Sequence, residues 1–152
     1  MTIGEKLRRM FSPRMRLLQL LAETAGDAEL LAAKLSRHAE LCSYPNIRAG
    51  LDEVAAGESA QAAVIRQLVL DHGMSPKLSV SPSHDGSSNW ERLQSDLALQ
   101  VKILRSLRSQ VPQWTALEPQ IAGSLSQAAA EEEGRIGRLR DLTLRCDPQA
   151  LD

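Results

Sequence analysis

Apolar residues recur every three or four positions through most of the chain, a spacing that is typical of one face of an α-helix. In the segment 47–70 this face consists of Ile47, Leu51, Val54, Ile65 and Leu68. Glu58 and Gln61 take the two positions in its middle where the rhythm calls for apolar side chains. The pattern predicts an amphipathic helix that turns two polar groups toward the interior at its centre.

The segment 121–144 repeats this pattern. Aligned without gaps with 47–70, it is identical at eight of 24 positions, and the alignment places Glu132 opposite Glu58 and Arg135 opposite Gln61. Helices rich in leucine and alanine can converge on such matches by chance. We prefer the interpretation as an internal repeat, which predicts two related pairs of helices.

The first pair is predicted to consist of helices over 14–43 and 47–72. Glycine weakens a helix and aspartate caps one, so we expect a kink or restart at Gly26-Asp27. The first helix should end before Pro45, because the residue preceding a proline is pushed out of helical conformation. Asn46 is the expected cap of the second helix, and Gly73 its expected end.

The second pair begins at Asn89. The first of its helices is predicted to run to Val111 and to end at Pro112. Thr115 and Glu118 have the spacing of a capping box, which places the start of the last helix there, and this helix should extend to about Cys146.

Between the pairs, residues 73–88 contain two prolines, two glycines and six serines, a composition that predicts an irregular connection. Extended, 16 residues reach about 50 Å, whereas a helix of 24 residues is about 36 Å long. The connection can therefore return along the whole bundle, so that the helices on either side of it run parallel. We expect one bundle over 14–146, an N-terminal arm over 1–13 with a short helix that braces the bundle, and a tail over 147–152.

Composition narrows the class of protein. With 18 basic and 19 acidic residues, the chain has no excess charge that would favour nucleic acid or a membrane surface as partners. It has only four aromatic residues (two Trp, one Tyr and one Phe), which favours helices over strands. No apolar run approaches a membrane span, and the N-terminus lacks the apolar core of a signal peptide. We therefore expect a cytoplasmic, all-α protein.

Two antiparallel helix pairs with a long connection, and a glutamate midway along the second helix of each pair, resemble the ferritin-like superfamily of four-helix bundles. The resemblance implies a di-iron site, with a Glu from the first and third helices and Glu-x-x-His from the second and fourth. Here the matching segments are ESAQ, 58–61, and EEGR, 132–135, and neither contains histidine. This departure predicts that the di-iron site has been lost.

Weaker candidates lie at the matching levels of the other two helices. The first helix offers Ala28 with Glu29 beside it, and the third offers Asp96 and Gln100. His38 lies on the apolar face of the first helix, where we expect a hydrogen-bonded core histidine and not a metal ligand.

We expect the polar side chains in the middle of the bundle to be buried together, with Arg135 supplying the positive charge that a metal would otherwise provide to Glu58 and Glu132. If the helices are rotated from this interpretation, these groups would instead be exposed to solvent.

The two cysteines test the direction of the helices. Parallel middle helices would bring Cys42 and Cys146 to the same end of the bundle. Their positions favour reduced, buried thiols, although a disulfide remains open if the Cα atoms lie within about 7 Å.

The sequence thus favours a non-catalytic interaction or scaffold module without a cofactor, which forms a homodimer or another homo-oligomer. One alternative is an iron-binding protein or di-iron-type oxidoreductase that uses only carboxylates. Its ligands would be Glu29, Glu58, Asp96 and Glu132. A second alternative is a protein that binds a small molecule in the bundle interior.

Overall fold

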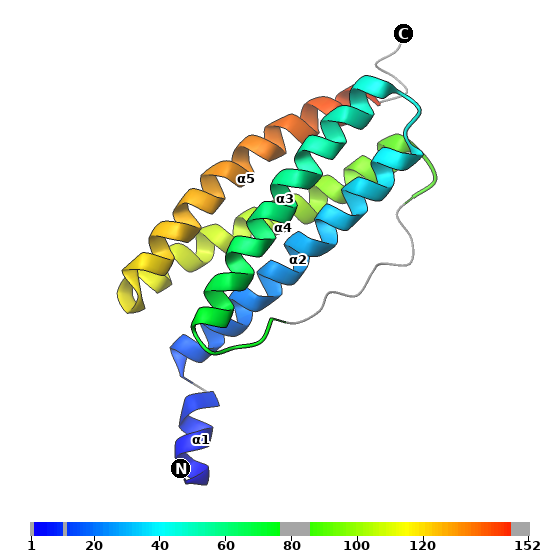
Figure 1. Cartoon of the computed structure of the whole chain (residues 1–152). Coiled ribbons are helices and arrows are strands. Elements are labelled where there is room, and N and C mark those ends of the chain that lie inside the picture. The colour runs from blue at the N-terminus through cyan, green and yellow to red at the C-terminus, as the bar shows by residue number, and fades with distance from the viewer. Residues whose placement is uncertain (1, 11, 77–85, 147–152) are drawn as a thin grey trace.

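The computed structural model shows an all-α protein and describes residues 2–10, 12–76 and 86–146. A short helix, α1 (Ile3–Met10), precedes four long ones. These are α2 (Pro13–Leu41), α3 (Pro45–Asp71), α4 (Asn89–Leu117) and α5 (Pro119–Arg145). No strand occurs in the described ranges, and the long helices lie together as a bundle (Figure 1). The predicted all-α class is confirmed.

Each long helix packs against two others: α2 contacts α3 and α4, and α5 contacts the same two. The core lies where the predicted apolar faces meet. Its fully buried side chains include Leu21, Leu31, Leu35, Ile65, Ile103, Leu107, Leu125 and Leu139. Burial of one such side chain contributes about 1.5–3 kcal/mol, so these faces supply the main stabilisation of the bundle.

Side-chain contacts show which helix ends meet. At one end, Glu118 lies 2.8 Å from Arg14 at the start of α2 and 3.6 Å from His72 at the end of α3. At the other end, Asn89 Nδ2 at the start of α4 lies 3.9 Å from Cys42 Sγ. The end of α3 and the start of α4 therefore lie at opposite ends of the bundle (Figure 1).

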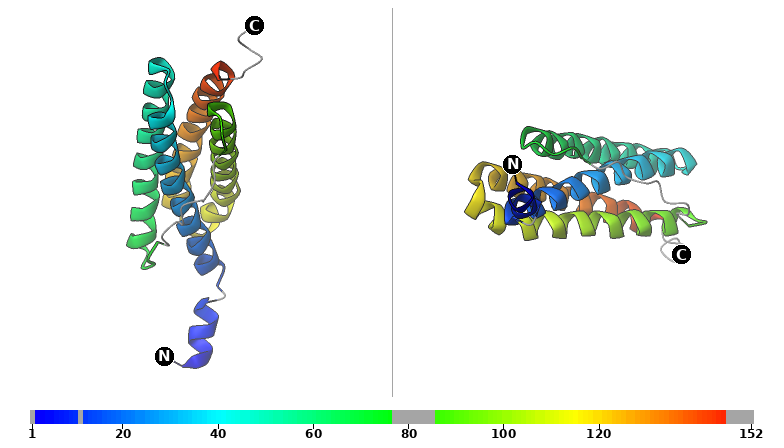
Figure 2. Two further views of the ribbon diagram at one scale, coloured as in Figure 1. Left: turned by 90° about the vertical axis from the view of Figure 1, so that its right-hand side faces the viewer. Right: turned by 90° about the horizontal axis from the view of Figure 1, so that it is seen from below.

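The α1 helix does not brace the bundle, contrary to the sequence-based expectation. In Figure 1 and the left view of Figure 2 it extends beyond the end of the bundle at which α2 begins. Its residues from Ile3 to Arg8 are exposed, including the apolar Ile3 and Leu7. Phe11, residues 77–85 of the predicted connection and the tail 147–152 lie outside the described residues.

Pro112 does not end α4, and this prediction was wrong. The helix continues through it to Leu117. A proline inside a helix removes one backbone hydrogen bond. Two residues later, Trp114 is completely buried, and its Nε1 donates to Gln110 Oε1 at 3.3 Å. Burial of this large side chain requires the extra turn and offsets the lost bond.

The predicted capping box was also wrong, for the same reason. Thr115 lies within α4, where its hydroxyl donates to the carbonyl of Val111 at 2.8 Å. The residue that caps α5 is Glu118, with Pro119 in the first turn and no hydrogen bond from the capping side chain. A proline in the first turn has a suitable φ and no N–H to leave unpaired, so it starts the helix without such a cap.

The predicted N-cap of α3, Asn46, was also wrong. Asn46 lies inside the helix, which begins at Pro45 with Tyr44 as its N-cap. The end of α3 is as predicted at Gly73, whose φ is 83°. The amides of Gly73 and Met74 donate to the carbonyls of Leu70 and Val69, at 3.0 and 3.2 Å, which is the hydrogen-bond pattern of a Schellman motif.

The predicted restart at Gly26-Asp27 does not occur, because α2 is one helix from Pro13 to Leu41. Gly26 is buried within it. A glycine in a helix costs only about 1 kcal/mol, less than the packing of the buried side chains on either side provides.

Cys42 and Cys146 are both free thiols, the first buried and the second half-buried. Burial raises the pKa of Cys146, and the neighbouring Cys42 raises it further. The two thiols therefore lie at the same end of the bundle.

Candidate functional site

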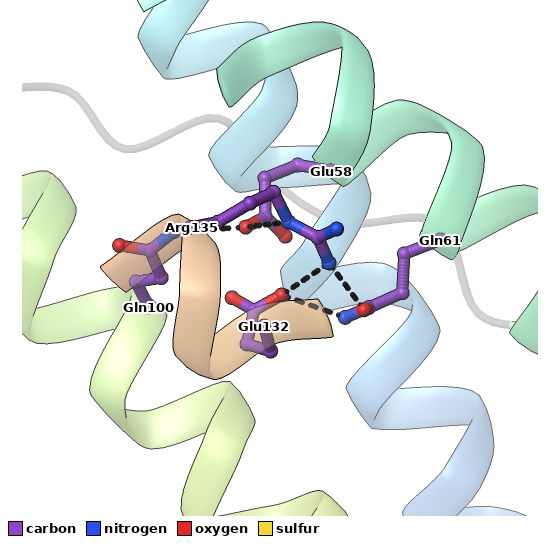
Figure 3. Close-up of polar contacts among 5 residues, drawn as sticks. All are labelled: Glu58, Gln61, Gln100, Glu132 and Arg135. Carbon is purple, nitrogen blue, oxygen red and sulfur yellow. Dashed lines mark hydrogen bonds and ion pairs between the residues drawn. The ribbon is translucent and has the colours of Figure 1, made fainter. Parts of the chain in front are cut away.

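Three polar side chains with almost no exposed surface occupy the middle of the bundle. Glu58 and Glu132 are 0% exposed, and Gln61 is 4% exposed. Glu58 and Gln61 are one turn apart on α3, and Glu132 and Arg135 are one turn apart on α5. Because residues three apart share a helix face, each pair points toward the other helix (Figure 3).

Arg135 connects the two pairs. Its Nε donates to Glu58 Oε1 at 3.0 Å, and its Nη2 donates to Glu132 Oε2 at 2.7 Å and also to Gln61 Oε1 (Figure 3). Gln61 Nε2 in turn donates to Glu132 Oε2 at 2.8 Å. One guanidinium thus binds both carboxyl groups and an amide, which is the geometry that a buried charge requires.

The helix α4 adds Gln100 to this group. Gln100 is 0% exposed, and its Nε2 donates to Glu58 Oε1 at 3.0 Å. We call the five residues Glu58, Gln61, Gln100, Glu132 and Arg135 the polar centre. It links three of the four long helices.

The carboxyl group of Glu132 does not titrate normally. Burial and the nearby Glu58 carboxylate raise the pKa of Glu132 to about 8, although Arg135 acts in the opposite direction. Burial lowers the pKa of Arg135, but the carboxyl groups of Glu58 and Glu132 outweigh it and raise that pKa. At neutral pH Glu132 therefore carries a proton, and the guanidinium of Arg135 lies between this carboxyl group and that of Glu58.

A proton on Glu132 also explains how the second oxygen of each carboxyl group can be buried without another hydrogen-bond partner. Glu58 Oε2 and Glu132 Oε1 are buried and accept no hydrogen bond from the described residues. Two carboxylates would repel each other, whereas a protonated carboxyl group can donate to its neighbour. The arrangement can hold and release one proton in the bundle interior.

Asp96 and His38 form a separate buried pair. His38 Nδ1 lies 2.5 Å from Asp96 Oδ2, between α2 and α4. Lys34 Nζ lies 3.7 Å from the other Asp96 oxygen and donates to Ser95 Oγ at 2.9 Å. The expected hydrogen bond of His38 is present, and its partner is the carboxylate that was a weaker candidate for the centre.

Glu29 does not reach the polar centre. Its carboxylate is partly exposed and lies 2.5 Å from Arg66 Nη2 of α3. Ala28, at the matching level of α2, is 0% exposed. Of the four helices, α2 is thus the one that gives the centre no polar side chain.

Two features of this region were missed from the sequence. Lys34 is a buried lysine four residues before His38. Residues with this spacing share a helix face, which could have indicated that Lys34 lies beside His38. Gly57 lies against Arg135, where a Cβ atom would be only 2.7 Å from Arg135 Cδ. The sequence feature that could have indicated this contact is the position of Gly57 directly before Glu58, the first polar residue in the middle of the apolar face.

No model of a known protein family matches the chain, and no curated protein shows significant similarity to it. Among the described residues, no group of three or more His, Cys, Asp and Glu has an arrangement that could hold a metal ion. Within the same ranges, none of the helices has both the length and the apolar character needed to cross a membrane.

Proposed function

We propose that this protein is a non-catalytic, ferritin-like interaction module that has lost its di-iron site and self-associates in the cytoplasm. The observation that carries the proposal is the position of Arg135. Its guanidinium contacts Glu58 and Glu132, the two glutamates at the places where the resemblance implies bridging metal ligands.

The course of the chain supports the ferritin-like part of the proposal. The ends of α3 and α4 that are joined in sequence lie at opposite ends of the bundle (Figure 1). This is the arrangement of two antiparallel helix pairs joined by a long connection, which is typical of ferritin-like bundles.

The residues present do not fit a di-iron centre. The histidines are replaced by Gln61 and Arg135, and Arg135 holds the two glutamates at 3.0 and 2.7 Å. A guanidinium among the ligands would oppose the charge of an added cation. The carboxylates needed for an all-carboxylate site are also engaged elsewhere, Glu29 with Arg66 and Asp96 with His38.

Exposed apolar side chains support self-association. Leu41 is the last residue of α2, Tyr44 follows that helix, and Leu144 lies in the last turn of α5, at the end of the bundle that also holds both cysteines. They are 54%, 55% and 63% exposed. We propose that a second copy of the chain covers them.

Anaerobic loading with ferrous iron, followed by metal analysis of the desalted protein, tests the loss of the metal site. We expect no more iron in the wild-type protein than in the variant Glu58→Ala. Stoichiometric iron in the wild type that is lost in Glu58→Ala would overturn the proposal.

Light scattering coupled to size exclusion tests the interaction role. Leu144→Glu should convert a wild-type homo-oligomer to a monomer, whereas Leu70→Glu, which is 47% exposed at the opposite end of the bundle, should not. A wild-type protein that is monomeric at all concentrations would contradict self-association.

A further inference from the structure

A groove of about 430 Å³ opens between α3 and α5, and the polar centre forms part of its floor. Gln61 and Arg135 line it together with small residues, among them Gly57, Ala60 and Ala128. Pockets for small molecules have volumes of about 300–1,000 Å³ and combine apolar walls with a few polar groups, so this groove is of a suitable size and composition.

The small residues keep Arg135 accessible from this groove. Because Gly57 has no side chain, the arginine stem passes directly against the α3 backbone, where a Cβ atom would be 2.7 Å from Cδ. The Arg135 side chain retains 16% exposure, while Glu58 and Glu132 behind it have none. The guanidinium is therefore the charged group of the centre that a ligand in the groove can reach.

One edge of this guanidinium is not used within the chain. Nε and Nη2 donate to Glu58, Glu132 and Gln61, but Nη1 has no hydrogen-bond partner among the described residues (Figure 3). The Nη1 atom would lie 3.4 Å from a Cβ on Gly57, which places it beside the glycine that lines the groove. Two N–H groups are thus available to an acceptor from outside.

We propose that this groove binds a small monocarboxylate with a short aliphatic tail, whose carboxylate accepts hydrogen bonds from Arg135 Nη1. Val64, Ala60 and Ala128 supply an apolar wall for the tail. The Glu58 carboxylate behind Arg135 and Glu131 at the groove disfavour a ligand with two negative charges. This ligand site goes beyond the interaction role and does not depend on it.

Protonation of Glu132 should regulate the binding. The groups that face Glu132 are Glu58 and Gln61 on α3 and Arg135 on α5, while α4 contributes the neutral amide of Gln100 through Glu58. Loss of the Glu132 proton adds one negative charge to the polar centre. A carboxylate should therefore bind more weakly once the pH exceeds the Glu132 pKa of about 8.

Titration of the ¹⁵N-labelled protein with hexanoate, followed by NMR, tests the proposal. We expect saturable shifts at the residues that line the groove, with an affinity about tenfold higher than that of the neutral analogue hexanamide. Affinity should fall by about tenfold between roughly pH 6.5 and 9.5. Shifts that are absent, or equal for the two compounds, would overturn the proposal.

A matched pair of variants avoids any change to the polar centre. Ala60 and Ala63 are both exposed on α3, but only Ala60 lines the groove. Ala60→Leu should fill the groove and abolish the hexanoate shifts, whereas Ala63→Leu should leave the affinity unchanged. Equal affinity in the two variants would place any binding elsewhere and overturn the assignment. Iron loading reports on the lost metal site alone, so the two proposals can fail separately.

Discussion

Arg135 Nε on α5 lies 3.0 Å from Glu58 Oε1 on α3, across a separation of 77 positions in the sequence. Around this pair, α3 and α5 approach each other through small residues such as Gly57 and Ala128, which have little apolar surface to bury. At this level the polar centre therefore adds contacts between the two helices to the hydrophobic burial that the rest of their length provides.

The first prediction concerns the loss of this guanidinium. Arg135→Leu removes the donors to Glu58, Glu132 and Gln61 and leaves an uncompensated buried carboxylate. Removing one partner from a buried ion pair costs about 3–5 kcal/mol. We expect the free energy of unfolding, measured with urea at neutral pH, to fall by that amount.

Arg140→Leu is the control for this measurement. Arg140 is exposed on the same helix, so its loss should change stability by less than about 0.5 kcal/mol. Equal stabilities of the Arg135 and Arg140 variants would show that the Arg135 contacts contribute nothing to the fold.

The second prediction concerns the glycine beneath Arg135. Alanine in place of glycine within a helix normally stabilises by about 0.5–1 kcal/mol. At Gly57 the new Cβ would be 2.7 Å from Arg135 Cδ, so the arginine must move and its hydrogen bonds must lengthen. We expect Gly57→Ala to lower the melting temperature.

Gly134→Ala provides the comparison, because a Cβ at this exposed position would meet nothing within 4 Å. It should raise the melting temperature. If both variants raise it equally, the close approach of Arg135 to Gly57 is not a constraint on the fold.

The positions of the helices could be predicted from the sequence, because each long helix has a regular apolar face. Their exact ends could not, as Pro112 shows. Local chemistry predicted a stop there, but the burial of Trp114 on the far side of the proline favours another turn. That contribution comes from tertiary packing, which a local pattern does not contain.

The residues of the polar centre that lie on α3 and α5 were identified because they interrupt apolar faces. The choice between Asp96 and Gln100 on α4 could not be made in the same way. These residues are one turn apart and both are completely buried, but Asp96 pairs with His38 and Gln100 with Glu58. Which one meets which partner depends on the axial offset between helices, and the sequence of one helix does not determine that offset.

The third prediction concerns pH. The pKa of Glu132 is raised from 4.5 to about 8 on folding, so the folded state binds more protons than the unfolded state between these values. The contribution of this group to stability is therefore complete below about pH 4.5 and is lost as the pH rises through about 8. We expect the free energy of unfolding to decrease from pH 6 to pH 9.

Comparison with Glu132→Gln isolates this effect from other titrating groups. The variant cannot lose the proton, so its stability should depend less on pH over the same range. Glu53→Gln, at a carboxylate that is 74% exposed, should keep the wild-type dependence. Parallel curves for the wild type and Glu132→Gln would contradict a protonated Glu132 at neutral pH.

The fourth prediction follows from the course of α4 through Pro112. This proline is exposed, and within the helix it removes one backbone hydrogen bond and crowds the preceding turn. Pro112→Ala restores the donor, although it also gives the unfolded chain more freedom, which offsets part of the gain. We expect a net increase of about 1–2 kcal/mol in the free energy of unfolding.

Pro119→Ala is the matched control. Pro119 occupies the first turn of α5, where a backbone N–H would have no partner within the helix, so the proline costs no hydrogen bond. This substitution should therefore be neutral or slightly destabilising. A Pro112→Ala variant no more stable than Pro119→Ala would mean that α4 accommodates the proline without cost.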